Sequence, residues 1–308
     1  MSRLSAIPPE LNGASFSVKE ARDFGVPASR LRHNELSAPF RGVRTTGSVA
    51  SIVDRAHAFA PLLDQQQFFS HSTAAALWGM WLPLRLQTAE IHVASIYPHR
   101  EPRMVGVVGH RFGVGRVERA LLFGLPLTTP VETWRLLAGE LSLDELIAAG
   151  DSLVRRQNPL ATIDDLVRAT GSHNGVRGLA LLRQALSMVR AGADSARETD
   201  LRLLIANFGL PEPTANERVS ADGEPVRFGD LVFRQWRTIA EYDGRQHRDN
   251  PRQFARDVVR LEQLAPEWTV IRVLNEHMSD PGSVAKRIAV ALSRNGWRPP
   301  RSKLHLLR

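Results

Sequence analysis

The chain contains no cysteine in its 308 residues. This absence excludes disulfide bonds and thiolate metal sites, and it makes a reducing compartment the simplest setting. The sequence also lacks a run of about 18 apolar residues and a basic-then-apolar N-terminal signal, so neither a membrane-spanning helix nor a secretory leader is expected. Together these absences predict a cytoplasmic protein that has no membrane partner.

Lysine is scarce as well. It occurs at Lys19, Lys286 and Lys303, so arginine supplies most of the 40 basic residues, which stand against 32 acidic ones and give a formal net charge of +8. The planar guanidinium suits phosphate groups, and the excess of positive charge therefore permits a nucleic-acid partner. An arginine-for-lysine bias also follows from a GC-rich genome, and both explanations stay open.

The length and an apolar content of 43% support several folded segments. We expect an α+β protein with a DNA-binding module at 1–50, a mixed α/β middle domain at 51–190, a third domain at 191–295 and a loosely ordered basic tail at 296–308. The small residues of 190–196 mark the joint before the third domain.

The first fifty residues have the pattern of a winged helix-turn-helix. Ser17 and Glu20 have capping-box spacing, Gly25 ends that short helix, and a second helix is expected at 28–34. The segment 39–44 contains a glycine turn and is expected to form the wing. In this arrangement the second helix enters the major groove of DNA.

That second helix would present Arg30, Arg32 and His33 to DNA. The alternative interpretation is that these three side chains belong to an ordinary solvated helix face. Spacing alone does not separate the two.

The middle of the chain predicts structure but no chemistry. The segment 70–79 is typical of a capped apolar helix, 91–94 of a buried strand and 144–155 of a further helix. His71 and His92 are interpreted as core or capping residues, because no second metal ligand stands at helical or strand spacing from either.

After the joint the pattern becomes regular, with a hairpin signal at Asp222-Gly223. The expected elements are a helix at 197–208, strands at 216–220, 226–233 and 239–243, a helix from 250 to 264, a strand at 268–274 and a helix at 281–293. The order is therefore helix, three strands, helix, strand, helix.

Carboxylates gather at one end of two of these strands. Glu241 and Asp243 are two apart and share one face of their strand. Asp230 can lie opposite them if the two strands pair through the short connection 234–236. Clustered carboxylates repel one another unless they share a proton or a cation, and a hard divalent ion such as Mg²⁺ or Mn²⁺ satisfies them.

This core order, with Asp in its second strand and Glu-x-acid at the end of the third, resembles the PD-(D/E)XK nuclease superfamily. The resemblance extends to its DUF559 branch, which is related to Vsr-like very-short-patch-repair endonucleases, through the segments RETDLRLL, EYDGRQH and RQFARDVVRLEQL. The upstream chain resembles the AbiEi-type winged-helix antitoxin region in RGVRT, FSHSTAAALWG and DELIAAGDSLV. The resemblance implies a restriction-endonuclease-like αβββαβ core at 191–295.

The resemblance also implies roles for individual residues. Asp230 and Glu241 correspond to the metal-binding acids, and Glu198 to the acid that the superfamily often carries on the first helix. Asp243 stands where the signature usually has lysine, so it is a further ligand or a partner of His247. His247 could transfer a proton near neutral pH.

Arg252, Arg256 and Arg260 recur every four residues on the helix expected after the site. They form either a solvated stripe paired with Asp249 and Asp257 or a surface that grips DNA phosphates.

The sequence therefore predicts a Mg²⁺-dependent or Mn²⁺-dependent DNA endonuclease with catalytic residues in the third domain and DNA docking by the first. Two alternatives stay open. One is an AbiEi-like antitoxin or transcriptional regulator that binds DNA without cleaving it and has a cognate toxin as its partner. The other is an interaction protein whose acidic strand end is incidental.

Overall fold

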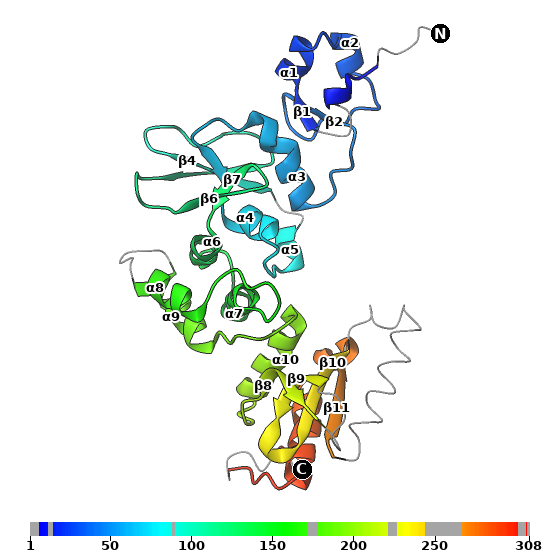
Figure 1. The fold of residues 1–308 in the computed structure, drawn as a ribbon, viewed down its shortest axis with the longest axis vertical. Helices are drawn as coiled ribbons and strands as arrows, with labels where there is room; N and C mark the ends of the chain where they lie inside the picture. Colours follow the sequence, from blue (N-terminus) through cyan, green and yellow to red (C-terminus); the bar gives the residue numbers. More distant parts are fainter. Residues whose placement is uncertain are drawn as a thin grey trace. The chain divides into compact units, whose positions relative to one another are not determined.

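The computed structural model describes residues 6–11, 15–87, 90–171, 178–220, 227–243, 267–300 and Leu306 (Figure 1). The described part of the chain is mixed α and β, with helices around three sheets, which confirms the predicted α+β class. The chain divides into two compact units, 1–146 with 164–183 and 147–163 with 184–308. None of the described helices has the length and apolar character needed to cross a membrane.

The N-terminal part of the first unit is a small helical module closed by a two-stranded ribbon. Its elements are η1 (Pro9–Leu11), β1 (Ser15–Ser17), α1 (Val18–Asp23), α2 (Ala28–Leu31) and β2 (Val43–Thr45). The Ser17 side chain accepts from the Glu20 N–H at 3.0 Å and caps α1, as its spacing predicts. Helix α2 ends at Leu31 and is shorter than the predicted 28–34, because residues 32–35 turn back toward the ribbon.

The rest of the first unit is built on a five-stranded sheet in the order β5-β4-β3-β7-β6. The elements are α3 (Ile52–Phe59), η2 (Ala60–Leu62), β3 (Gln67–Phe69), α4 (His71–Leu77), α5 (Leu84–Gln87), β4 (Ile91–Ile96), β5 (Val107–Phe112), β6 (Arg119–Leu122), β7 (Leu125–Thr128) and α6 (Pro130–Leu137). Strands β4 and β5 run parallel, and α4 packs against β4 and α6. This packing brings the start of α4 next to strand β4 of the parallel pair β4 and β5.

Three helices follow along the chain, at α7 (Leu143–Leu153), α8 (Ile163–Gly171) and α9 (Leu179–Met188). Within the first unit, the indole N–H of Trp134 donates to the Leu146 carbonyl at 2.9 Å, and this hydrogen bond links α6 to the first half of α7. The C-terminal half of α7 belongs to the second unit.

The second unit contains a four-stranded sheet in the order β11-β10-β9-β8. Its elements are α10 (Ala196–Asn207), β8 (Thr214–Val219), β9 (Arg227–Phe233), η3 (Arg234–Trp236), β10 (Thr238–Asp243), β11 (Thr269–Leu274), η5 (Asn275–Ser279) and α12 (Pro281–Arg294). Strands β8, β9 and β10 are antiparallel neighbours, whereas β11 lies parallel to β10. This order confirms the predicted sequence of elements, except that the predicted turn at 222–223 and the helix at 250–264 lie outside the described residues.

The two faces of this sheet carry different cores. One face packs with α10 and α12 in a cluster that includes Leu231, Phe233, Ala240 and Ile271. The other face carries a smaller cluster of Val219, Val232, Ile239 and Trp268. Alternation along each strand therefore decides on which face a polar side chain lies.

The C-terminal segment corrects one expectation. Trp297 and Leu306 are buried in the same core as α10 and α12, at 7% and 5% exposure. The predicted loose tail at 296–308 is therefore wrong at these two positions, because its apolar side chains have a core to enter. The predicted limits at residues 50 and 190 do not coincide with the division between the units, and they stay predictions.

Candidate functional site

Strand register brings Asp230 and Glu241 together. In the antiparallel pair of β9 and β10, Leu231 lies opposite Ala240, so the next position in the same register places Asp230 opposite Glu241. Leu231 and Ala240 point into the α10 and α12 core, and both carboxylates therefore lie on the other face of the sheet. The observed register ends at the pair of Leu231 with Ala240, one position before the two acids, and is compatible with the pairing that the sequence predicts for them.

The surroundings restrict both carboxylates, Asp230 through a hydrogen bond and Glu241 through burial. Asp230 accepts the backbone N–H of Tyr242 through Oδ2 at 2.9 Å, which fixes its orientation against β10. Glu241 is 9% exposed, well below what a carboxylate usually shows at a protein surface. Tyr242 points to the opposite face, where it packs on the core and donates through its hydroxyl to Asn275 at 3.0 Å.

Arg272 brings a positive charge to this face. The parallel register places Arg272 beside Glu241, and its guanidinium forms an ion pair with Asp243. Asp243 is therefore paired with a cation from the neighbouring strand. Sequence reasoning missed Arg272, because nothing in the spacing indicates which residue of β11 aligns with Glu241.

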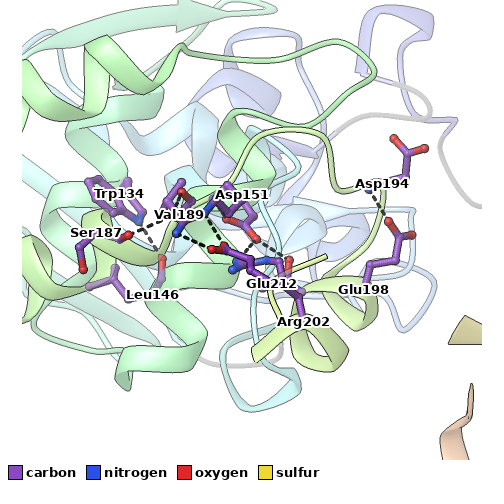
Figure 2. A network of polar contacts seen from close by, with 11 residues as sticks. Trp134, Leu146, Asp151, Ser187, Val189, Asp194, Glu198, Arg202 and Glu212 are labelled. Carbon is purple, nitrogen blue, oxygen red and sulfur yellow. Dashed lines mark hydrogen bonds and ion pairs between the residues drawn. The ribbon is translucent and has the colours of Figure 1, made fainter. Parts of the chain in front are cut away.

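Glu198 faces the sheet as expected, but both of its carboxylate oxygens already accept hydrogen bonds. Its Oε2 accepts from the Asp194 N–H at 2.9 Å and the Asn216 amide at 2.6 Å, and its Oε1 accepts from the Ser195 hydroxyl at 2.9 Å. Figure 2 shows the contact between Asp194 and Glu198. Burial raises the pKa of Glu198, while these three hydrogen bonds oppose the rise.

These bonds give Glu198 a capping role at the start of α10, because the Ser195 hydroxyl in turn accepts the Glu198 N–H at 3.2 Å. Asn216 is the second residue that sequence reasoning missed. Its positive φ of 46° interrupts the β8 ladder at the position that faces Asp230 in the register, and its amide turns to Glu198.

The carboxylates suit an ion that needs few protein ligands. Among the residues that the structure describes, Asp230, Glu241, Asp243 and Glu198 do not contribute to any set of three ligand atoms within 4.8 Å of one another. Mg²⁺ commonly binds one or two carboxylates and keeps several waters, so Asp230 and Glu241 fit that ion. His247, Arg252, Arg256 and Arg260 lie outside the described residues.

The expected DNA-facing side chains of the N-terminal module differ in exposure. Arg30 is 9% exposed and forms an ion pair with Glu35 at 2.9 Å. The Arg30 side chain is therefore mostly covered, and the expectation that it faces DNA stays a prediction. Arg32 is exposed and His33 is partly buried, so Arg32 is the better placed of the two for a phosphate.

A second cluster, unexpected from the sequence, lies in the first unit. His71, His92 and His110 place one ligand atom each within 4.8 Å of one another. The rings of His71 and His110 stack at 3.8 Å between centroids, and His110 Nε2 lies 3.0 Å from His92 Nδ1. Glu140 completes the surroundings, with Oε1 3.2 Å from His92 Nδ1.

Burial sets the charge of this cluster. Burial, followed by His110 and His92, lowers the pKa of His71 to about 2, and burial followed by His110 lowers that of His92 to about 4. Burial also lowers the pKa of His110. Burial raises the pKa of Glu140 to about 7, against the opposing charge of Arg85. The three imidazoles are therefore neutral at pH 7.

The interpretation of His71 and His92 as core or capping residues missed this cluster. Its members come from the first residue of α4 and from two parallel strands, in which His92 lies opposite Val108 and His110 opposite Ala94. These pairings place both strand histidines on one face, two positions apart. A search for ligands at helical or strand spacing within one element cannot find such a set.

Two proteins of Mycobacterium tuberculosis resemble the chain, MT2308 in strain CDC 1551 and Rv2248 in strain H37Rv, both named as uncharacterized. Each is 28% identical over 224 residues, which covers 72% of this chain and 80% of the relative. No protein-family model matches the chain, and no solved structure matches it.

Proposed function

We propose that the second unit is a Mg²⁺-dependent endonuclease that hydrolyses phosphodiester bonds in DNA. The observation that carries the proposal is the β9 and β10 register, which, continued by one position, sets Asp230 opposite Glu241 on the sheet face away from α10 and α12. Two adjoining carboxylates are the donor set that a hard divalent cation prefers. The surrounding elements follow one another as a helix, three strands and a fourth strand, and this order is compatible with the superfamily that the sequence resembles.

Each residue has a defined task in this proposal. Asp230 and Glu241 would hold the ion, and the Tyr242 N–H keeps the Asp230 carboxylate oriented before binding. Bound Mg²⁺ would supply Lewis-acid polarisation of the scissile phosphate. Arg272 balances the charge of Asp243, which otherwise would add repulsion for an incoming phosphate beside Glu241. Glu198 supports the site from behind through Asn216 and the start of α10.

The remaining features set the context of the reaction. The net charge of +8 favours a polyanionic substrate, and the exposed Arg32 in the N-terminal module is a candidate for docking on DNA phosphates. A chain without cysteine is compatible with action in the cytoplasm.

The test is cleavage of supercoiled plasmid DNA by the purified full chain with Mg²⁺ or Mn²⁺. We expect nicked or linear products, and we expect Asp230→Asn to abolish them. Asp200→Asn is the matched control, because it removes the same charge from a partly exposed carboxylate that pairs with Arg197 on α10. Cleavage that survives in Asp230→Asn, or no cleavage by the wild type with either ion, refutes the proposal.

One observation favours a second candidate. The oxygens of Glu198 accept hydrogen bonds from three donors, and the described carboxylates supply no set of three close ligand atoms. A domain with this site could bind DNA without turnover, as an antitoxin-like regulator with a cognate toxin. Specific retardation of its own promoter DNA, with no cleavage at any divalent ion, would support this alternative.

A further inference from the structure

We propose that His71, His92 and His110 form a binding site for a divalent transition-metal ion of the zinc type. The site lies in the first unit and does not depend on the proposed nuclease activity. Its basis is the convergence of three imidazole ligand atoms within 4.8 Å of one another, with the Glu140 carboxylate beside them.

The distances are close to those of a coordinated ion. Two nitrogens bonded at about 2.0–2.1 Å to one tetrahedral Zn²⁺ lie roughly 3.3 Å apart. His110 Nε2 and His92 Nδ1 are 3.0 Å apart, at hydrogen-bond distance. If the two rings move slightly apart, the ion can lie between these nitrogens and replace the proton of that hydrogen bond. His71 is stacked on His110 at an interplanar angle of 18°, and its ring must rotate to aim a nitrogen at the same point.

The charge balance also favours a cation. The chain places the Glu140 carboxylate next to the three imidazoles, with Oε1 3.2 Å from His92 Nδ1. Glu140 Oε2 is buried and accepts no hydrogen bond from the described residues. A buried, unpaired carboxylate oxygen is costly, and a divalent ion next to Glu140 would relieve that cost. The carboxylate would be either the fourth ligand or the acceptor that orients His92.

The three histidines are positioned before any ion arrives. The Ser70 N–H donates to the His92 carbonyl at 3.1 Å, and the His92 N–H donates to the Thr73 hydroxyl at 2.7 Å. These bonds join the start of α4 to β4. His71 itself has a φ of 49°, a conformation that L residues other than glycine rarely adopt, and this backbone turn carries its ring over His110.

The donor set selects the class of ion. Imidazole nitrogens suit zinc, copper, iron and nickel, whereas Mg²⁺ and Ca²⁺ prefer oxygen ligands. Cysteine is absent from the chain, so a thiolate site cannot compete for the same ion. The site is therefore distinct in chemistry from the pair of carboxylates in the second unit.

The experiment uses the full chain after treatment with a chelator. Zn²⁺ binding is measured by titration calorimetry, and Co²⁺ serves as a coloured probe, because four-coordinate Co²⁺ absorbs visible light far more strongly than six-coordinate Co²⁺. We expect one strongly bound Zn²⁺ per chain and a four-coordinate Co²⁺ spectrum. His71→Asn and His110→Gln should each weaken binding at least about tenfold, since each removes a ligand.

Asn is chosen at position 71 because it tolerates a positive φ better than most residues. His99→Gln is the control, since His99 is exposed in the turn after β4 and should leave binding unchanged. Glu140→Gln keeps all three imidazoles and should also weaken Zn²⁺ binding, so it tests the site even if a histidine variant fails to fold. Wild-type affinity no greater than that of His110→Gln, or equal loss in His99→Gln, overturns the proposal.

Discussion

Asp151 offers the sharpest test of how the second unit is held together. Its side chain is completely buried near the end of α7, and it accepts three hydrogen bonds. The donors are the Arg190 N–H at 2.7 Å, the Thr199 hydroxyl at 2.8 Å and the Arg202 guanidinium at 2.7 Å. Figure 2 shows Asp151 and Arg202 facing each other in this network. Arg202 is only 3% exposed, so its charge depends on Asp151 for compensation.

We expect Asp151→Asn to lower the free energy of unfolding of the second unit by about 3–5 kcal/mol. The shape is kept, but a buried guanidinium loses its counter-charge, and breaking one side of a buried ion pair costs about that amount. The amide of Asn also presents N–H groups toward donors, which leaves at least one donor unsatisfied. Urea denaturation followed by circular dichroism measures the total, and hydrogen exchange of the α10 amides assigns it to this unit.

Asp200→Asn is the matched control for this measurement. Asp200 pairs with Arg197 one helical turn away on an exposed part of α10, where such pairs contribute about 0.3–0.5 kcal/mol. The double replacement Asp151→Asn with Arg202→Met should recover the part of the loss that comes from the unpaired guanidinium, because it removes both charges and keeps an acceptor at position 151. If Asp151→Asn and Asp200→Asn have equal effects, the argument from buried charge is refuted.

Three further outcomes are expected. Burial raises the pKa of Glu198 above 4.5, so the folded state binds the carboxyl proton more tightly than the unfolded state does. The stability that this proton contributes is complete below about pH 4.5 and declines as the pH rises through the folded-state pKa. Glu198→Gln should therefore gain stability relative to wild type as the pH rises above about 4.5 in urea unfolding, and a difference that stays constant with pH would contradict this. Gly178→Ala should cost about 2–3 kcal/mol in thermal unfolding, because the new Cβ would lie 2.6 Å from the Ala138 carbonyl oxygen at a φ of 81°. Gly79→Ala, with a φ of 66° but no atom within 4 Å, should cost only about 1 kcal/mol, and equal losses would refute the steric reasoning. Trp297→Ala should cost about 3–5 kcal/mol by the same measurement, and a loss below about 0.5 kcal/mol would mean that the C-terminal segment is not packed.

Local patterns predicted the second unit well. Ser195 caps α10 as its spacing indicates, and strands β8 to β10 follow one another along the chain as antiparallel neighbours. In such meanders the register is set by the turns and by alternation, so the pairing of β9 with β10 up to Leu231 and Ala240, one position from the two acids, agrees with the residue pattern. Helix α12 begins at Pro281, where the sequence places it.

Contacts between elements that are distant in sequence could not be predicted in this way. The ion pair of Arg272 with Asp243 depends on a parallel register across a long connection. The histidine cluster depends on the alignment of β4 with β5 and on the packing of α4. The burial of Arg30 could not be predicted for a related reason, since helix periodicity does not show its ion pair with Glu35.

The position of Asp151 has a practical consequence for isolating the C-terminal part of the second unit. A fragment that begins at the predicted joint near residue 191 would omit residues 147–163, which belong to the second unit. Arg202 and Thr199 would then lose their shared partner, and the fragment would expose surface that the end of α7 normally covers. A soluble fragment should therefore begin before residue 147, even though it then includes residues 164–183, which belong to the other unit.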